Sequence, residues 1–508
     1  MKIYQGLCPG ASSLRSRYAA VRTLYSPDYQ ATTREVLDSA ALVFYFPGPK
    51  TVTGEDVLEF HVHGGPAIVK AVLDAIPKSI QHATEIRSDI RYAEPGEFTR
   101  RAFYNDRLDL TQVEALGDTL SAETEQQRRL AVRGLSNTLN ERYEGWRKQL
   151  LYARGELEAL IDFSEDQHFD ESAEEFVHSV SEQIRSLLSR IHKTTRNAVK
   201  GELLRYGIKI ALLGAPNAGK SSLLNQIVGR EAAIVSPEAG TTRDVIEVNV
   251  DIRQYFCKFN DLAGVRSQEQ GNSVINDIEK EGISRAKAHA RQADVVVVVI
   301  PVEKDVNSPR GYRISYSPEI IDFVKNEIQK HQTVMFVLNK SDLAGQDLKT
   351  LTEEANTVLE QHLGTSVSVL PVSCLSAAEE MTDGPIDEGG LQAFLNGLSD
   401  VLSTLTTAEQ VDTSHTGAIG FDESLGTTQR QQNLLKQCAI ELTAFLNGLD
   451  SGQNQETQSK DMPEVDVVLS AERLRCAADC LAKITGRGEA GDVEEVLGVV
   501  FEKFCVGK

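Results

Sequence analysis

Ile208-Lys-Ile-Ala-Leu-Leu-Gly-Ala-Pro-Asn-Ala-Gly-Lys-Ser-Ser222 is the stretch of sequence that decides the fold. Its first six residues are largely apolar and predict a buried strand, and its end begins a helical pattern that continues to Ile227. The residues from Gly214 to Ser221 have the spacing of a Walker A loop, in the strand–loop–helix context that this motif requires. A glycine-rich surface turn is the simpler alternative, but the order of the three elements disfavours it.

The chemistry of this loop predicts a nucleoside phosphate ligand. Its glycines let backbone N–H groups turn inward around a β-phosphate. Lys220 can place a positive charge beside the β- and γ-phosphates, and Ser221 offers a hydroxyl to magnesium. The residues expected to contact the nucleotide here are Gly214, Asn217, Ala218, Gly219, Lys220, Ser221 and Ser222.

The base of the nucleotide is predicted by Asn339-Lys340-Ser-Asp342, which follows the apolar run 334–338. Ligands bind at the carboxyl ends of strands in open α/β sheets. A carboxylate at that edge can accept both N–H donors of guanine, which adenine lacks. Alone these four residues would be a common surface turn, but downstream of a Walker loop they predict a guanine site. Ser373-Cys374 fits the weaker motif that backs the base.

Two short motifs between these sites fit the switch elements of a GTPase. Gly240-Thr-Thr-Arg-Asp244 offers Thr242 as a second magnesium ligand, with Thr241 beside it. Asp261-Leu-Ala-Gly264 fits the Asp-x-x-Gly motif, in which the Asp holds magnesium through water and the Gly senses the γ-phosphate. Each motif alone is as often a plain turn, but the order and spacing of all of them predict a GTPase.

Val265 departs from the usual GTPase pattern. Many GTPases carry a Gln at this place to orient the attacking water, and a valine cannot hydrogen-bond to water. Hydrolysis must therefore use another group. The acidic segment 276–281 supplies the candidates, each of which would otherwise be a solvated charge on a helix.

The composition is that of a globular chain with several domains. The sequence has 508 residues, 53 basic and 74 acidic side chains, and a formal net charge of −21; its length suggests about three domains. The longest apolar run, 295–300, is far shorter than the roughly 20 residues of a membrane span, so no membrane insertion is expected. Because the chain is acidic, contacts to RNA must be local or come from a partner.

Cysteines and histidines do not predict a metal site or a disulfide framework. The seven cysteines are scattered singly, as is typical of a reducing compartment. Cys476 and Cys480 lie one helical turn apart, but no second Cys or His pair stands nearby, so we expect core thiols. His61 and His63 share one face of a predicted strand without a third ligand, so we expect packing and hydrogen bonding.

The sequence pattern divides the chain into four segments. Residues 1–108 mix strands, expected at 41–47 and 57–62, with a helix at 66–76, which is an α+β pattern. Residues 109–203 have helical periodicity, and it returns in residues 399–508, where two polar stretches at 408–426 and 451–464 are expected to be loops.

Residues 204–398 have a different pattern. Short buried strands alternate with helices, which predicts a parallel sheet with crossover helices. The strands are expected at 208–213, 295–300, 334–338 and 367–372. The expected fold class is therefore multidomain α+β and α/β: an N-terminal α+β domain and a helical domain that is interrupted by an inserted P-loop domain of the Ras-like type.

Further distinctive segments lie outside the GTPase motifs. They are Phe46-Pro-Gly-Pro49, Thr53-Gly-Glu-Asp-Val-Leu-Glu59, His61-Val-His-Gly-Gly65, the passage from Ala93 to Leu110, Ile161-Asp-Phe163, and the C-terminal Phe504-Cys-Val-Gly-Lys508. With the GTPase motifs set between helical halves, they closely resemble the MnmE/TrmE family of tRNA-modification GTPases over nearly the whole chain.

The resemblance implies a role in tRNA processing. GTP hydrolysis would drive a C5 aminomethyl-type modification of the tRNA wobble uridine, of the carboxymethylaminomethyl or taurinomethyl kind, in a complex with an FAD-dependent MnmG/GidA-type partner. The N-terminal domain would bind the one-carbon donor, a 5-formyl- or 5,10-methylene-tetrahydrofolate, and would form the homodimer. Potassium would take the place of an arginine finger, whose effect on the rate is about 10³–10⁵.

The resemblance also implies roles for single residues. Potassium would be held by Asn217 and by backbone oxygens of Ser236, Glu238 and Thr241. Glu279 would orient the attacking water and so answer the problem of Val265, acting with Lys220 and Thr242. The folate contacts would be Glu59, Arg107, where the family often has Lys, and Lys508. Cys505 would have a substrate-side role.

Two other interpretations compete with this one. A ribosome-assembly GTPase, acting as an RNA-binding switch, usually carries a basic RNA module such as a KH fold, and none is evident in a chain of charge −21. A folate-binding scaffold with an inactive GTPase is disfavoured by the intact Lys220, Ser221 and Asp342.

The N-terminus and the inserts lead to two further expectations. The polar inserts at 302–317 and 451–464 are longer than a compact bacterial member needs, which favours a mitochondrial homologue although no transit peptide is visible. The family's first N-terminal strand, with an arginine that contacts folate, has no counterpart before residue 17. We therefore expect a shortened form that binds folate weakly and dimerises poorly.

Overall fold

The computed structural model describes residues 1–27, 34–80, 90–163, 173–234, 247–260, 275–306, 308, 310–383, 387, 389–411, 422–453 and 467–487. The chain forms two compact units. Unit 1 consists of Met1–Gly117, Leu135–Asp170 and Asn447–Lys508, and unit 2 consists of Asp118–Gly134 and Glu171–Leu446.

Unit 1 begins with a small antiparallel sheet. Its strands are β1 (Ala20–Tyr25), β2 (Val36–Phe46) and β3 (Val57–His61), in the order β1-β2-β3, with helices α1 (Lys2–Leu7) and α2 (Pro66–Lys78) beside them. Alternate residues of the strands face these helices, so Tyr4, Leu24, Val43 and Val72 are buried in one core. The two predicted strands and the helix at 66–76 are thereby confirmed.

The other regular elements among the described residues of unit 1 are helices. The helices are α3 (Glu97–Tyr104), the start of α4 (Leu110–Ser121), α6 (Thr138–Phe163) and α15 (Val467–Thr485). Helices α6 and α15 pack along each other, and Glu144 of α6 accepts hydrogen bonds from Thr485 at 2.7 Å and Arg487 at 3.1 Å. The long packed helices that the periodicity predicts are therefore present.

Unit 2 contains the large sheet, whose strand order is β11-β10-β8-β4-β7-β6-β5. The strands are β4 (Ile208–Leu213), β5 (Ala232–Ile234), β6 (Glu247–Ile252), β7 (Tyr255–Asn260), β8 (Val295–Lys304), β10 (Thr333–Asn339) and β11 (Val369–Val372). Strands β11, β10, β8, β4 and β7 are parallel neighbours, and β6 and β5 continue the sheet in antiparallel pairing. The four predicted strands are confirmed as β4, β8, β10 and β11. The bounds of β4 agree fully, β8 and β10 are longer than predicted, and β11 begins two residues later.

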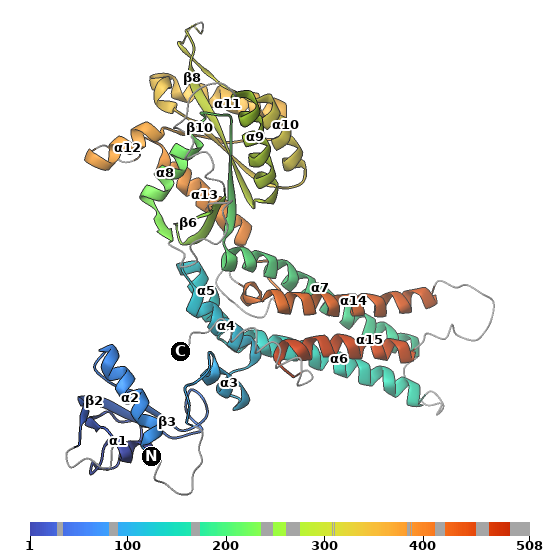
Figure 1. Cartoon of the computed structure of the whole chain (residues 1–508). Helices are drawn as coiled ribbons and strands as arrows, with labels where there is room; N and C mark the ends of the chain where they lie inside the picture. Colours follow the sequence, from blue (N-terminus) through green and yellow to red (C-terminus); the bar gives the residue numbers. More distant parts are fainter. Residues whose placement is uncertain are drawn as a thin grey trace. The chain divides into compact units, whose positions relative to one another are not determined.

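Helices cover both faces of this sheet, as buried parallel strands require. On one face lie α8 (Lys220–Arg230), α12 (Cys374–Asp383) and α13 (Leu391–Thr406), packed through Leu223, Ala377 and Phe394. On the other face lie α9 (Ile275–Gln292), α10 (Pro318–Gln329) and α11 (Leu348–Leu363). Figure 1 shows α9, α10 and α11 grouped beside β8 and β10.

Helices precede and follow the sheet of unit 2 along the chain. They are α5 (Glu125–Gly134), α7 (Ala173–Tyr206), the short 3₁₀ helix η2 (Glu423–Gly426) and the first part of α14 (Gln429–Gln453). Along the chain, α7 is followed directly by β4. Helices α7 and α14 lie side by side in Figure 1. Among the described helices, none is long and apolar enough to cross a bilayer.

Three details differ from the sequence predictions. Part of the polar insert at 302–317 is regular, because β8 continues to Lys304 and pairs with β9 (Tyr312–Ile314). The end of the stretch at 408–426 is the helix η2, capped by Asp422 and anchored by the fully buried Leu425. Cys476 and Cys480 are half-buried on α15 rather than in the core, because they lie on the edge of the buried stripe of that helix.

Candidate GTP-binding site

The Walker loop joins the end of β4 to the start of α8. Gly219 has φ 93° and Asn217 has φ 60°, so the chain turns through the left-handed region twice before the helix begins. Lys220 Nζ donates to the carbonyls of Gly214 at 2.8 Å and Ala215 at 3.0 Å, which holds the ammonium group over the loop. Because the first N–H groups of α8 have no helical partner, this end can bind a phosphate.

The guanine motif lies against this loop. Asn339, which is 1% exposed, donates its Nδ2–H to the carbonyl of Ala218 at 2.8 Å, across 121 residues of sequence. A Cβ atom on Gly219 would lie 2.0 Å from Asn339 Nδ2, so only glycine fits there. The contact fixes the distance between the phosphate loop and the base motif. The two predicted motifs are therefore brought together.

Asp342 is oriented from the third motif. Ser373 donates its hydroxyl to Asp342 Oδ1 at 2.7 Å, and its backbone N–H donates to Gly389 O at 2.9 Å. This hydrogen bond restricts the carboxylate and uses one of its roughly four lone-pair sites. Both oxygens can still accept, so the carboxylate can receive two N–H donors of a flat base.

Cys374 contacts the same group of residues, Ala218, Asn339, Asp342 and Ser373, which we call the nucleotide corner. Its thiol lies 3.4 Å from Asn339 Oδ1 and donates to it. Burial raises the pKa of the Cys374 thiol to about 11, and the hydrogen bond to Asn339 opposes this only in part. The side chain is therefore a neutral hydrogen-bond donor at neutral pH and braces Asn339.

Much of the predicted catalytic machinery lies outside the described residues. These positions are Ser236, Glu238, Thr241, Thr242, Asp261, Gly264, Val265, Cys505 and Lys508. Glu279 belongs to α9, but its side chain is outside the described part. Of the expected magnesium ligands only Ser221 is described, and it is half-buried at the start of α8, where a hydroxyl can reach a metal beside a phosphate.

The candidate folate residues of unit 1 have local partners. Glu59 on β3 lies 3.3 Å from His61 Nε2, and both side chains are about half exposed. Arg107 follows α3, is exposed, and donates from Nε to the carbonyl of Thr51 at 3.0 Å. The described contacts therefore do not join Glu59 to Arg107.

His63 contacts Asp38 through both its ring and its backbone. Its Nδ1 lies 2.9 Å from Asp38 Oδ1, and its backbone N–H donates to Asp38 Oδ2 at 2.8 Å. Burial acts to raise the pKa of Asp38, but hydrogen bonds from Ala40 and His63 outweigh it and hold the pKa below its usual range. Among the described residues no group of three metal-type ligands occurs. The prediction of hydrogen-bonded histidines is confirmed.

Sequence reasoning missed two features of the nucleotide corner. It assigned Asn339 to the base and not to the Walker loop, and it gave no partner to Asp342. The signal that could have found the first is the Asn itself, because a buried amide must hydrogen-bond and the nearest open carbonyls lie on the loop. Ser373 belongs to a short, weak motif, and only the fold shows that its hydroxyl lies beside Asp342.

A parallel sheet with a Walker loop, a guanine motif and a bracing Ser-Cys turn at one edge defines a P-loop GTPase. The comparisons with known proteins identify the family. Residues 1–107 match the "GTP-binding protein TrmE N-terminus" and residues 110–505 match the "MnmE helical domain". The chain belongs to the MnmE/TrmE family of tRNA modification GTPases, and it is a GTPase.

Relatives from three kingdoms cover the chain almost completely. The mitochondrial tRNA modification GTPase MSS1 of Saccharomyces cerevisiae is 33% identical over all of this chain and 88% of its own length. The mitochondrial 5-taurinomethyluridine-[tRNA] synthase subunit GTPB3 of Homo sapiens is 35% identical over 97% of this chain and 85% of its own. For tRNA modification GTPase MnmE of Rhodopseudomonas palustris the identity is 34%, over 92% and 86%.

Proposed function

We propose that this chain hydrolyses GTP to drive modification of the wobble uridine of tRNA at carbon 5. The observation that carries the proposal is the joining of the two halves of the nucleotide site by Asn339 and Ala218 in a chain of this family. The relatives named for tRNA modification, and the one named for 5-taurinomethyluridine, support the substrate and the kind of group installed.

The described residues would share the work in the nucleotide site. Lys220 would neutralise the β- and γ-phosphates, and the first N–H groups of α8 would donate to the β-phosphate. Asp342 would accept from both N–H donors of guanine, while the Ser373 hydroxyl donates to its Oδ1 at 2.7 Å. Glu279 would orient the attacking water, since Val265 cannot.

Two metal ions belong to the proposal. Magnesium would be held by Ser221 and Thr242, with Asp261 acting through water, and potassium by Asn217 with Ser236, Glu238 and Thr241. Asn217 is exposed and left-handed in the loop, so its amide can face a cation beside the phosphates. When bound, the two ions supply positive charge where the γ-phosphoryl group leaves.

The remaining parts of the proposal concern the other domains and the partners. Segment 1–108 would bind the tetrahydrofolate one-carbon donor through Glu59, Arg107 and Lys508 and form the homodimer; segments 109–203 and 399–508 would form one helical domain around the inserted GTPase segment 204–398. Cys505 would lie on the substrate side. An FAD-dependent MnmG/GidA-type protein would complete the enzyme in mitochondria.

The test of the proposal is an exchange of base specificity at Asp342. Asp342→Asn replaces an acceptor oxygen by an amide donor, so the full-length variant should lose GTP turnover and gain turnover of xanthosine triphosphate, whose base offers a carbonyl there. Asp322→Asn, at an exposed position on α10, is the matched control. A variant that keeps its preference for GTP would contradict the assignment of the base site.

Cells in which this gene is replaced by either variant link the activity to tRNA. Mass spectrometry of tRNA hydrolysates should show the modified wobble uridine with Asp322→Asn and not with Asp342→Asn. Normal modification in the inactive variant would exclude tRNA modification as the purpose of GTP hydrolysis. Turnover measured in potassium and in sodium tests the proposed potassium site in the same preparations.

A further inference from the structure

The hairpin of β6 and β7 lies, along the chain, between the two predicted switch motifs. Strand β6 begins at Glu247, three residues after Asp244, and β7 ends at Asn260, directly before Asp261. The hairpin is six residue pairs long and in regular register from Glu247↔Asn260 to Ile252↔Tyr255. A shift at its open end is therefore carried rigidly to its turn.

The turn of this hairpin is held in an unfavourable conformation. Both of its residues, Arg253 (φ 52°) and Gln254 (φ 78°), are left-handed, although neither is Gly, Asn or Asp. Three contacts hold it: Asp251 Oδ1 accepts from the Gln254 N–H at 2.7 Å, Arg253 lies 3.8 Å from Glu231, and Arg253 donates to Gln392 Oε1. Strain of this kind persists where the surrounding structure fixes it and is concentrated at functional positions.

The turn rests on helix α5. The backbone N–H of Gln126, in the first turn of α5, donates a hydrogen bond to the carbonyl oxygen of Gln254 at 3.4 Å. Tyr255 packs on the buried cluster of Leu130, Leu204 and Leu425, which joins α5, α7 and η2. We name these contacts of Gln126 and Leu130 with Gln254 and Tyr255 the α5 joint.

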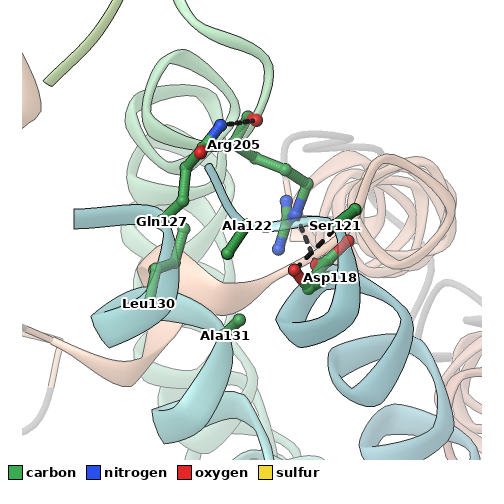
Figure 2. Close-up of a pocket in the computed structure, with 7 residues that line it drawn as sticks. All are labelled: Asp118, Ser121, Ala122, Gln127, Leu130, Ala131 and Arg205. Atoms are coloured by element: carbon green, nitrogen blue, oxygen red, sulfur yellow. Dashed lines mark hydrogen bonds and ion pairs between the residues drawn. The ribbon is translucent and has the colours of Figure 1, made fainter. Parts of the chain in front are cut away.

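The α5 side of the joint is itself fixed. Gln127 accepts from the N–H groups of Glu123 and Thr124 and donates to Arg205 O at 2.9 Å. Figure 2 shows Arg205 reaching past this contact to Asp118, at 2.6 Å, beside a cavity of about 20 Å³, large enough for one water. Helix α5 thus has rigid attachments and a small free space.

Helix η2 packs against α5 and α7 at the same place. Arg205, whose side chain is 9% exposed, also donates to the carbonyls of Gly426 at 3.0 Å and Thr427 at 3.3 Å. A Cβ atom on Gly201 would lie 1.8 Å from Leu425 O, so the backbones of α7 and η2 are in direct contact. Because these contacts fix α7 and η2 around Leu130, a displacement of Tyr255 would move Leu130, and with it α5, rather than be absorbed by its neighbours.

We propose that Gln254 and Tyr255 are positioning residues of the GTPase reaction, and that the α5 joint couples the nucleotide state of the switch motifs to helix α5. The proposal rests on the proposed function only in taking residues 240–244 and 261–264 as the switches. Coupling is reciprocal: contact with α5 sets the position of the switches, and the nucleotide changes the position of α5.

The experiment measures both directions in the full chain. Hydrogen–deuterium exchange of peptides covering 125–134 is compared with GDP and with a non-hydrolysable GTP analogue, in the parent, Tyr255→Ala, Tyr255→Phe and, as control, Tyr152→Ala, an exposed tyrosine of α6. The parent and the control should differ in exchange between the nucleotides, and Tyr255→Ala should not. Tyr255→Phe, which keeps the ring on Leu130, should restore the difference.

Steady-state kinetics supplies the second readout. For Tyr255→Ala we expect kcat for GTP to fall about fivefold or more while KM changes little, because a small misplacement of groups that act in the chemical step slows that step. Tyr255→Phe should recover kcat. If the alanine variant does not fold, Tyr255→Leu replaces it. Nucleotide-dependent protection of peptide 214–230 without any change in 125–134 would overturn the α5 joint and leave the GTPase assignment intact.

Discussion

The nucleotide corner of unit 2 and the candidate folate residues of unit 1, Glu59 and Arg107, differ in what their side chains contact. We call the second pair of residues, with their contacts, the β3 edge. In the corner, Asn339 and Asp342 are held by Ala218 and Ser373, which come from other elements of the sheet. At the β3 edge, Glu59 contacts His61, two residues away, and Arg107 contacts a loop carbonyl. The corner is therefore organised by the fold before any ligand binds, whereas Glu59 and Arg107 are free to change partners when one does.

The largest effect that would sharpen this comparison is expected at Glu279. If Glu279 orients water, Glu279→Ala should lower GTP turnover about 10²–10⁴-fold without changing nucleotide affinity, because binding belongs to the preformed corner and the chemistry does not. Stopped-flow hydrolysis and fluorescent-nucleotide titration measure the two. Glu281→Ala serves as the control, and equal losses in both variants would remove the role from Glu279.

The second effect tests whether the corner is as rigid as its contacts indicate. Gly219→Ala introduces a Cβ atom 2.0 Å from Asn339 Nδ2 at φ 93°. Losing the Asn339–Ala218 hydrogen bond and adding left-handed strain should weaken GDP binding by about 2–4 kcal/mol. Titration calorimetry would measure it, with Gly229→Ala on α8, which has open space at Cβ, as the control. Unchanged affinity would show that Asn339 and the loop can shift to accommodate the Cβ atom, so that the nucleotide corner is not rigid.

The third effect addresses the β3 edge directly. If Arg107 binds the folate, Arg107→Ala should weaken binding of 5-formyltetrahydrofolate about 10-fold, the value of one hydrogen bond to a charged group. Calorimetry on the full chain, with Lys78→Ala as control, measures the change. Equal affinity of both variants would remove Arg107 from the site.

The fourth effect concerns stability rather than activity or ligand binding, and it depends on the structural charge of Glu97 on α3. Hydrogen bonds from the Glu94 N–H, then from Arg101 and Arg91, lower the pKa of Glu97 to about 2 from its ordinary 4.5. The carboxylate therefore stabilises the fold above pH 4.5, and this contribution is lost as the pH falls towards 2. Glu97→Gln should cost about 1–3 kcal/mol at pH 7 and little at pH 2.

Urea unfolding followed at Trp146, the single tryptophan, reports on unit 1 and measures this difference. Glu94→Gln is the control, because only the backbone of Glu94 takes part in the contact. A difference between Glu97→Gln and the parent that stays constant from pH 7 to pH 2 would mean that the ionised carboxylate is not what matters.

The sequence predicted β4, β8, β10 and β11 well because these strands are buried and largely apolar, but it did not predict β5, β6, β7 or β9. Runs such as 295–300 are uniformly apolar and β-branched, and their ends are marked by functional motifs. It predicted less well where structure depends on distant contacts. Residues 423–426 end a stretch that is polar overall, yet they form a helix because the single leucine, Leu425, packs between α5 and α7. Likewise nothing local indicates that Ser373 holds Asp342, because the pair is made by neighbouring strands of the sheet.

The seat of Tyr255 bears on how the GTPase can be studied in isolation. A fragment cut at residues 204–398 would omit Leu130 and Leu425 and remove the apolar cover that they give to Tyr255 and Leu204, although Tyr255 would keep its contacts with the core of the sheet. Newly exposed apolar surface promotes self-association in solution, so a dimer seen with that fragment would be open to misinterpretation. A fragment that retains α5, α7 and η2 keeps the surface covered, and association measured with it would report on the nucleotide face.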